Sequence, residues 1–377
     1  MGGIYIHIPF CKRKCSYCDF YSVAAKSDSM ERYVKAVIDE AEMRIGELGG
    51  AEIKTMYVGG GTPSLLSAEQ LSQLIGGVRG QLTTDAVQEM TIEVNPDDIT
   101  DEYALMLHKI GFNRVSMGVQ SFNDDELQFI NRRHTAQQAT DAVNRLRAAG
   151  FDNISIDLIY GIPKQTQQTW RESVNQAIAL DVQHISCYCL SYEEGTRLYM
   201  MRKLGKITEC SDEECVAMYS TLVELLKKAG YEHYEISNFA KAGKRSMHNS
   251  NYWNFTPYLG LGAAAHSYDG KNRRYNPSNI KEYAEKIGSG ATAYTTESEE
   301  DWQRYNELVM IRLRTTEGLE AKSIERKFGQ DLYRYFVKNA ERHVNAGNLS
   351  KNDGHYRLSE AGVMLADMVI RDVIYVE

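Results

Sequence analysis

The chain has 377 residues, with 43 Lys and Arg against 51 Asp and Glu and a formal net charge of −8. This acidic balance argues against nucleic acid or an anionic membrane surface as the main partner. The length is ample for a sizeable core and predicts two or three domains. The sequence contains no run of roughly eighteen apolar residues, which a membrane span would require.

The arrangement of the cysteines and the first residues of the chain indicate the cellular compartment. Three of the seven cysteines are clustered, which fits a reducing cytoplasm better than a disulfide framework. The first expected strand begins at residue 3, so we expect no signal peptide. The sequence therefore predicts a cytoplasmic protein.

The chain opens with a strand-like alternation followed by a cysteine-rich loop. Ile4, Ile6 and Ile8 share one face, and Pro9 ends the pattern. The loop after it carries the cysteines in C-x3-C-x2-C spacing, at Cys11, Cys15 and Cys18. Turns of three or four residues can bring the sulfurs to one side, around one soft metal centre.

Three thiols favour an iron–sulfur cluster over a structural zinc site. A structural zinc site needs four protein ligands, and no His or Cys stands within twenty residues after Cys18. A three-thiolate iron–sulfur cluster leaves one iron open for a ligand. The alternative is three unrelated buried cysteines, which this spacing disfavours.

A βα repeat follows along the first half of the chain. We expect strands at 3–8, 54–58, 90–95, 114–120, 154–158 and 184–190, and helices that include 30–41, 68–79, 135–149 and 168–180. Such units build parallel sheets with right-handed crossovers. Six units predict an α/β fold with an incomplete (β/α)6 TIM-like barrel rather than the closed barrel of eight.

Polar candidates fall at the carboxyl ends of these strands, where parallel α/β folds bind ligands. They are the cysteine loop, the turn Gly59-Gly60-Gly61-Thr62, and Glu93, Gln120, Asp157 and Ser191. The alternation also predicts a polar face opposite the apolar one, made of Tyr5, His7, Thr91, Glu93, Ser116, Gln120, Ser155 and Asp157. A polar barrel interior implies a cavity that holds a ligand.

Each of these residues also has a structural interpretation. Glycine turns after strands are common, and a turn without Cβ atoms lets backbone groups approach a neighbour closely. A single polar side chain more often pairs with a neighbouring residue than with a ligand. Cys187 and Cys189 fit packing positions on an apolar strand, and Cys210 and Cys215, in an acidic helical stretch, receive no assignment.

The second half of the chain contains two further regions. The stretch 231–268 is rich in aromatic residues and histidine, and it could be a packed linker. From about residue 297 the pattern predicts helices at 319–328 and 331–346, a small hairpin around Asp353-Gly354, and a last helix from Ser359 to about 374. This order is winged-helix-like. We therefore expect domains at 1–230, 231–296 and 297–377.

The segment IHIPFCKRKCSYCDF resembles the cluster motif of the radical S-adenosylmethionine (SAM) superfamily. The version is the one shared by oxygen-independent coproporphyrinogen III oxidases and HemW-type heme chaperones. The resemblance implies a [4Fe–4S] cluster on Cys11, Cys15 and Cys18, whose open iron binds SAM. The reduced cluster of that superfamily cleaves SAM to a 5′-deoxyadenosyl radical, and the protein positions the cofactor.

The same resemblance assigns SAM-binding residues position by position. It implies cofactor contacts for Tyr5, Gly60, Gly61, Thr62, Glu93, Gln120, Arg132, Asp157 and Ser191. Ser191 is the weakest transfer, because its surroundings, CYCLSYEEGT, follow the HemW version only. The C-terminal region also resembles the last domain of these two families.

The segment His248-Asn-Ser-Asn-Tyr-Trp is similar to the H-N-x-x-Y-W motif of HemW-type chaperones. Imidazole is a common axial heme ligand, and adjacent Tyr and Trp rings can cover a porphyrin face. The resemblance therefore implies His248 as the heme ligand, with His266 as a less favoured second. A lone His is more often structural.

Two departures separate this chain from the oxidases. The oxidases carry a further cysteine at the position where this chain has Phe20. They also carry an N-terminal extension before the first strand, where this chain starts at Gly2-Gly3. We therefore expect a heme chaperone that delivers heme to apo-hemoproteins, without coproporphyrinogen oxidase activity. One alternative is the oxidase, which converts coproporphyrinogen III to protoporphyrinogen IX, and another is a different radical enzyme that acts on a tetrapyrrole.

Lys12, Arg13 and Lys14 form a basic patch between the cluster cysteines. A solvated loop is one interpretation. The other is that the patch offsets the negative charge of the reduced cluster and docks an acidic electron donor, a flavodoxin or ferredoxin. A homodimer is a further expectation, with the cluster needed for dimerisation or heme transfer.

Overall fold

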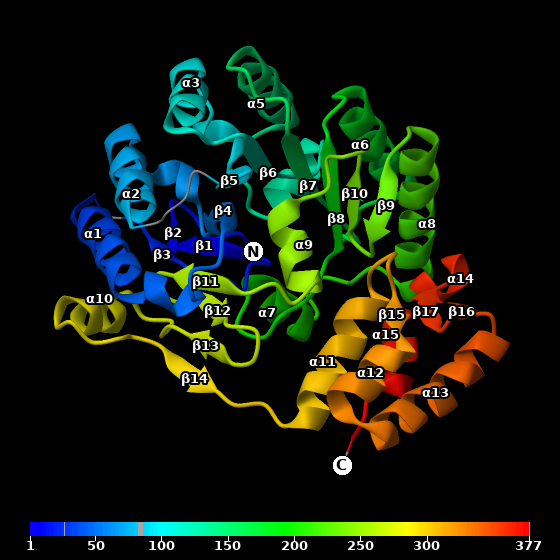
Figure 1. Cartoon of the computed structure of the whole chain (residues 1–377). Helices are drawn as coiled ribbons and strands as arrows, with labels where there is room; N and C mark the ends of the chain where they lie inside the picture. The colour runs from blue at the N-terminus through cyan, green and yellow to red at the C-terminus, as the bar shows by residue number, and fades with distance from the viewer. Residues whose placement is uncertain (26, 82–85, 377) are drawn as a thin grey trace. The chain divides into compact units, whose positions relative to one another are not determined.

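The computed structural model describes residues 1–25, 27–81 and 86–376 (Figure 1). The chain forms two compact units. The first comprises Met1–Tyr231 and Ala240–Glu297, and the second comprises Glu232–Phe239 and Ser298–Glu377. Residues 240–297 thus belong to the N-terminal unit, whereas the three-domain division remains a prediction.

The first unit is built on a parallel sheet of the predicted strands. These are β1 (Gly2–Ile8), β4 (Ile53–Gly60), β5 (Glu89–Val94), β6 (Arg114–Gln120), β7 (Ile154–Tyr160) and β8 (His184–Cys189). Each pairs in parallel with the next in that order. No pairing joins β8 back to β1 within the described residues, so the predicted incomplete barrel is confirmed.

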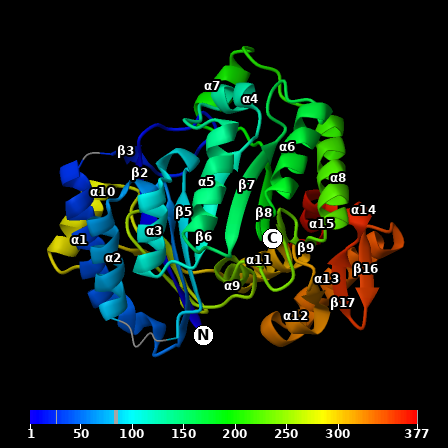
Figure 2. The ribbon, with the colours of Figure 1, turned by 90° about the horizontal axis from the view of Figure 1, so that it is seen from above.

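Helices cover the outer face of this sheet (Figure 2). They are α1 (Ser27–Arg44), α2 (Ala68–Gly80), α3 (Asp101–Ile110), α5 (Ala136–Ala148), α6 (Gln167–Ala179) and α8 (Asp212–Lys228), with the shorter α4 (Asp124–Phe129) and α7 (Arg197–Lys203) near the carboxyl ends of the strands. The side chains of Ile4, Ile6 and Ile8 are fully buried on the apolar face.

The helix starts follow from local sequence. Ser67 accepts a hydrogen bond from the Gln70 backbone, while the Gln70 side chain accepts one from the Ser67 backbone, which closes a capping box on α2. Such a cap stabilises a helix by about 1 kcal/mol. Equivalent boxes open α5 and α6. Leu71 and Leu74 then face the core.

The segment after residue 240 extends the sheet on its other edge. Strand β11 (Tyr258–Leu261) pairs in parallel with β1, and β12 (His266–Tyr268), β13 (Arg273–Tyr275) and β14 (Thr295–Glu297) add to it antiparallel. Helix α9 (Met247–Trp253) packs on β1 and β4, and α10 (Ile280–Gly288) packs on α1. The sequence analysis expected no strands here.

The second unit carries the predicted helix–helix–hairpin order. It contains β9 (Glu232–Glu235), α11 (Asp301–Leu313), α12 (Ala321–Phe328), α13 (Gln330–Asn345) and a sheet in the order β15 (Leu319–Glu320), β17 (His355–Leu358), β16 (Leu349–Asn352). Strand β10 (Asn238–Ala240) has its first two residues in this unit and Ala240 in the first unit. Leu319 is a strand residue rather than the start of a helix, because it pairs with Tyr356. The last predicted helix is divided into α14 (Glu360–Val363) and α15 (Ala366–Val373).

No helix among the described residues is both long and apolar enough to cross a membrane.

Candidate functional site

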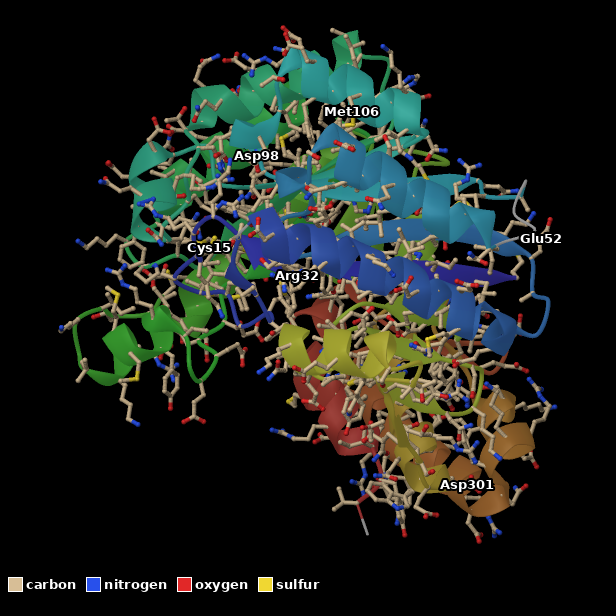
Figure 3. All side chains as sticks on the ribbon, turned by 90° about the vertical axis from the view of Figure 1, so that its left-hand side faces the viewer. Cys15, Arg32, Glu52, Asp98, Met106 and Asp301 are labelled. Carbon is tan, nitrogen blue, oxygen red and sulfur yellow. The ribbon has the colours of Figure 1, made fainter. Side chains whose placement is uncertain are left out.

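The cysteine loop lies at the carboxyl end of β1. Figure 3 places Cys15 and Glu52, which precedes β4, at opposite ends of the sheet. The loop is closed by a short parallel pair, β2 (Phe10–Cys11) with β3 (Val23–Ala24). It is also tied to the loop after α4, since Ser16 N donates to Ile130 O at 3.1 Å.

The three cysteine side chains are half-buried, and two of them have polar neighbours from the loops after β4 and α4. Thr62 Oγ1 donates to Cys11 Sγ at 3.5 Å, and Arg132 Nη1 donates to Cys15 Sγ at 3.4 Å. Burial is the main cause that raises the pKa of the Cys18 thiol to about 11, and the nearby Cys15 and Cys11 thiols act in the same direction. Iron would have to displace this proton, because thiolates are the metal ligands.

The donor set fits an iron–sulfur cluster better than a single metal ion. Within 1–25, 27–81 and 86–376, no three His, Cys, Asp or Glu side chains are grouped closely enough to hold one ion. A cluster spaces its thiolates more widely than one ion does. One loop supplies three thiols, and a guanidinium and a hydroxyl beside them can offset the charge of a thiolate-bound cluster.

The glycine turn packs tightly against the base of the cysteine loop. Gly61 N donates to Ile8 O at 2.8 Å, and a Cβ on Gly61 would lie 2.8 Å from Phe10 O. Gly60 has a φ of +111°, and its N–H donates to Glu93 Oε2 at 2.9 Å. These contacts explain the glycines structurally, so a cofactor contact at Gly60 and Gly61 remains a prediction.

Glu93 is held inside the barrel by two donors. Its Oε1 accepts a hydrogen bond from Tyr57 Oη at 2.8 Å, in addition to the Gly60 contact. Burial raises the pKa of the Glu93 carboxyl to about 7, although both hydrogen bonds act in the opposite direction. The carboxyl therefore changes charge close to neutral pH.

Asp157 provides a second carboxyl in the interior. Burial raises its pKa to about 6, while hydrogen bonds from Ser186 and Ser116 act against the rise. Arg114, at the start of β6, is 1% exposed and lowers the pKa of both carboxyls by its charge. The sequence analysis did not single out Arg114, because an Arg at a strand start gives no signal of its own.

Arg132 connects the cysteine loop to the barrel interior. Its Nη2 donates to Asn95 Oδ1 at 2.7 Å and to the Gly118 carbonyl, while Nη1 reaches Cys15. Asn95 Nδ2 in turn donates to Thr62 Oγ1 at 3.4 Å. Asn95 is a residue that the sequence analysis missed, although it directly follows the third strand.

The three remaining residues predicted to contact SAM lie at different positions along their strands. Gln120 is at a register shift between β6 and β7 with a φ of +71°, and its amide lies beside Gly118, close to Arg132. Tyr5 Oη is hydrogen-bonded to His7 Nδ1 at 2.9 Å, partway along β1. Ser191 is exposed, just beyond the end of β8.

His248 lies at the opposite end of the barrel from the cysteine loop. A Cβ on Gly3 would lie 3.3 Å from His248 Cε1, and the strand from Gly3 to Ile8 spans roughly 16 Å. The imidazole is 1% exposed, and Thr55 Oγ1 and Tyr252 Oη each lie 2.9 Å from one of its nitrogens. Burial lowers the pKa of His248 to about 3, so the ring is neutral.

His266 differs from His248 in position and access. It begins β12 after the loop that follows β11, at the end of the sheet where β1 leads into the cysteine loop. Its side chain is exposed, with the Tyr275 ring 5.8 Å away.

Comparison with known proteins places this architecture in a family. Residues 5–177 match the radical SAM superfamily model, and residues 300–365 match the HemN C-terminal domain model. A heme chaperone HemW from Bacillus subtilis (strain 168) is 35% identical over 371 residues, covering 98% of this chain and 98% of the relative. The chain belongs to the HemW family. HemW of Escherichia coli (strain K12) is 37% identical over 265 residues, 70% of this chain and 69% of the relative.

A solved structure supports the same fold for this HemW family member. The coproporphyrinogen III oxidase (HemN) from Escherichia coli, a radical SAM enzyme, matches with a TM-score of 0.84 at 22% identity, covering 99% of this chain and 90% of that chain. At this identity the likeness bears on the fold alone, and it confirms the predicted α/β partial barrel. Radical SAM membership implies a [4Fe–4S] cluster and SAM, whereas the individual contacts remain predictions.

Proposed function

We propose that this protein is a heme chaperone that binds a [4Fe–4S] cluster, SAM and heme, and delivers heme to apo-hemoproteins. The observation that carries the proposal is the near full-length similarity to relatives named heme chaperone HemW. The three-thiol loop beside a polar, charged interior supports it. The proposed location is the cytoplasm, and the homodimer remains part of the proposal.

Cys11, Cys15 and Cys18 would hold the cluster, whose open iron binds SAM when the cluster is present. The residues proposed to hold SAM are Tyr5, Gly60, Gly61, Thr62, Glu93, Gln120, Arg132, Asp157 and Ser191. Arg132 is suited to a carboxylate, because its buried Nε has no hydrogen-bond partner among the described residues. Glu93 and Asp157 are suited to hydroxyl donors such as those of a ribose.

Heme titration into the anaerobically reconstituted protein, followed by transfer to an apo-hemoprotein, tests the proposal. A heme chaperone binds heme and transfers it without forming protoporphyrinogen from coproporphyrinogen III in the presence of a reductant. Protoporphyrinogen formation with turnover would instead establish the oxidase and overturn the assignment.

The pKa of Glu93 predicts a pH dependence of nucleoside binding. An ionised carboxylate accepts hydrogen bonds from ribose hydroxyls more strongly than a carboxylic acid does. With a pKa of about 7, the ionised fraction rises about tenfold between pH 6 and pH 8. The affinity for 5′-deoxyadenosine, measured by calorimetry, should therefore rise by up to about tenfold over this range.

A Glu93→Gln variant provides the control for this prediction. The amide does not titrate, so the rise in affinity between pH 6 and pH 8 should shrink to at most about twofold, the change that Asp157 with its pKa of about 6 would leave. An equally steep pH profile in Glu93→Gln would show that a group other than Glu93 responds to pH.

The three residues of the basic patch differ in their contacts. Lys12 Nζ forms an ion pair with Asp98 at 2.9 Å, and Lys14 Nζ lies 3.5 Å from Phe20 O. Arg13 instead lines a cleft of about 540 Å³ together with Arg132, Arg133 and Arg197. Asp124 also lines this cleft, and Arg133 is ion-paired with Asp97 and Asp98. The positive charge that would favour an acidic partner therefore comes mainly from Arg13, Arg132 and Arg197.

Charge reversal at Arg13 tests this surface without breaking the Lys12–Asp98 pair. Arg13→Glu should slow cluster reduction by flavodoxin about tenfold at low salt and flatten its dependence on ionic strength. Stopped-flow absorbance measures the rate. Reduction by a small-molecule reductant should be unchanged, and an unaltered flavodoxin rate would exclude Arg13 from docking.

A further inference from the structure

Three cysteines outside the cluster loop converge at one place in the first unit. Cys189 ends β8, Cys210 precedes the N-cap residue of α8, and Cys215 lies in the first turns of α8. Chain order separates Cys189 from the other two by the segment that contains α7. The fold therefore brings together thiols that sequence spacing does not group.

Cys189 and Cys215 are in direct contact. A hydrogen bond between the two thiols acts to raise the pKa of Cys189 and to lower that of Cys215. Gly161 faces both sulfurs, since a Cβ there would lie 3.2 Å from Cys215 Sγ and 3.5 Å from Cys189 Sγ. The glycine, with a φ of +78°, leaves the space that the two sulfur atoms share.

The pair is also accessible from solvent. Cys189 is exposed and Cys215 is half-buried, whereas Cys187, two residues earlier on the same strand, is buried. Cys187 thus fits the predicted packing role and Cys189 does not. Cys210 is half-buried, and its thiol donates to Ile162 O at 3.5 Å.

We propose that Cys189 and Cys215 form a reversible disulfide that tethers the end of β8 to the start of α8, with a low-molecular-weight disulfide as the oxidant. The thiolate of one cysteine attacks the small disulfide, forming a mixed disulfide and releasing one small thiol. The second cysteine thiolate then attacks the mixed disulfide, forming the protein disulfide and releasing the second small thiol. Two protein thiols are oxidised and one small disulfide is reduced.

The bridge would act on a functional segment. It closes a loop from residue 190 to residue 214, which carries Ser191 and α7. A covalent closure reduces the conformational freedom of this loop. The oxidised form therefore restrains a segment beside the proposed cofactor site, independently of whether the proposed heme function holds.

The electrostatics of the pair set its rate of reaction. Burial raises the pKa of Cys189 to about 12, and burial also raises the pKa of Cys215. Because the thiolate is the nucleophile, oxidation should be slow at pH 7. Its rate should rise about tenfold per pH unit, hence about 100-fold between pH 7 and pH 9.

Treatment of the full-length protein with excess oxidised glutathione, followed by alkylation and peptide mass spectrometry, tests the proposal. The expected result is a cross-link between the Cys189 and Cys215 peptides that dithiothreitol removes. Cys210→Ser should retain this cross-link, and Cys215→Ser should lose it. Peptide mapping distinguishes the Cys189–Cys215 disulfide from any disulfide formed by the cluster cysteines.

Two outcomes would overturn the proposal. One is that both thiols stay fully alkylatable after prolonged oxidation at pH 9. The other is that Cys189 links to Cys210 rather than to Cys215, in which case Cys215→Ser would keep the cross-link. Circular dichroism of each serine variant verifies that the fold is intact.

Discussion

Replacing Cys15 by alanine is expected to abolish cluster binding. Anaerobic reconstitution of the unaltered protein should yield about four iron atoms per chain, and Cys15→Ala should fall below about one. The loss is large because the cluster would keep only two protein thiolates, Cys11 and Cys18. Removal of the Cys15 sulfur also leaves Arg132 Nη1 without its sulfur partner. Iron assay and the visible absorbance of the cluster measure the effect.

The chain offers a matched control for this experiment. Cys210 is half-buried like Cys15 but lies outside the loop, so Cys210→Ala should keep its full iron content. A thermal melt of both apo variants distinguishes cluster loss from unfolding. If folded Cys15→Ala retained four iron atoms, the three-thiolate cluster assignment would be wrong, and with it the basis for placing SAM.

Heme binding should respond in opposite directions to two substitutions around His248. If His248 Nε2 is the axial ligand, it has to exchange the Tyr252 hydroxyl at 2.9 Å for the heme iron. His248→Ala should weaken heme binding by at least about tenfold, as expected for loss of a metal ligand. Tyr252→Phe should tighten it about fivefold, because the competing hydrogen bond of about 1 kcal/mol is gone. Heme titration followed by Soret absorbance measures both.

His266→Ala is the control that separates the two candidate ligands. The imidazole of His266 is exposed, whereas ligation by His248 requires α9 to move away from the starts of β1 and β4. With His248 as ligand, His266→Ala should leave affinity and spectrum unchanged. If His266→Ala lost heme binding while His248→Ala kept it, His266 would be the axial ligand and His248 would have a structural role.

The six-stranded partial barrel could be predicted because hydrophobic alternation, strand length and turn residues agree along the first half of the chain. The same pattern predicted that Glu93 and Asp157 share one face and one end of the sheet. Their proximity is visible in the pKa of Glu93, which the charge of Asp157 raises. Most of the candidate site residues could therefore be predicted from their positions at the ends of strands.

Long-range pairing could not be predicted from local pattern. Strand β11 has only four residues, and its partner β1 lies more than two hundred residues earlier. The ion pair between Lys12 and Asp98 depends in the same way on how separate loops meet. His248 matched a family motif, but its burial against Thr55 followed from the packing of α9, which sequence spacing does not reveal.

The pairing of β1 with β11 has a consequence for synthesis of the chain. Strand β1 leaves the ribosome before β4, and its other hydrogen-bonded neighbour, Tyr258–Leu261, follows more than two hundred residues later. Until then the edge of β1 offers unpaired backbone groups, which invite association with other chains. The strand that leads into the cysteine loop is therefore fully paired only after residues 258–261 have been translated. A cluster inserted before that point would bind to a sheet that still lacks β11.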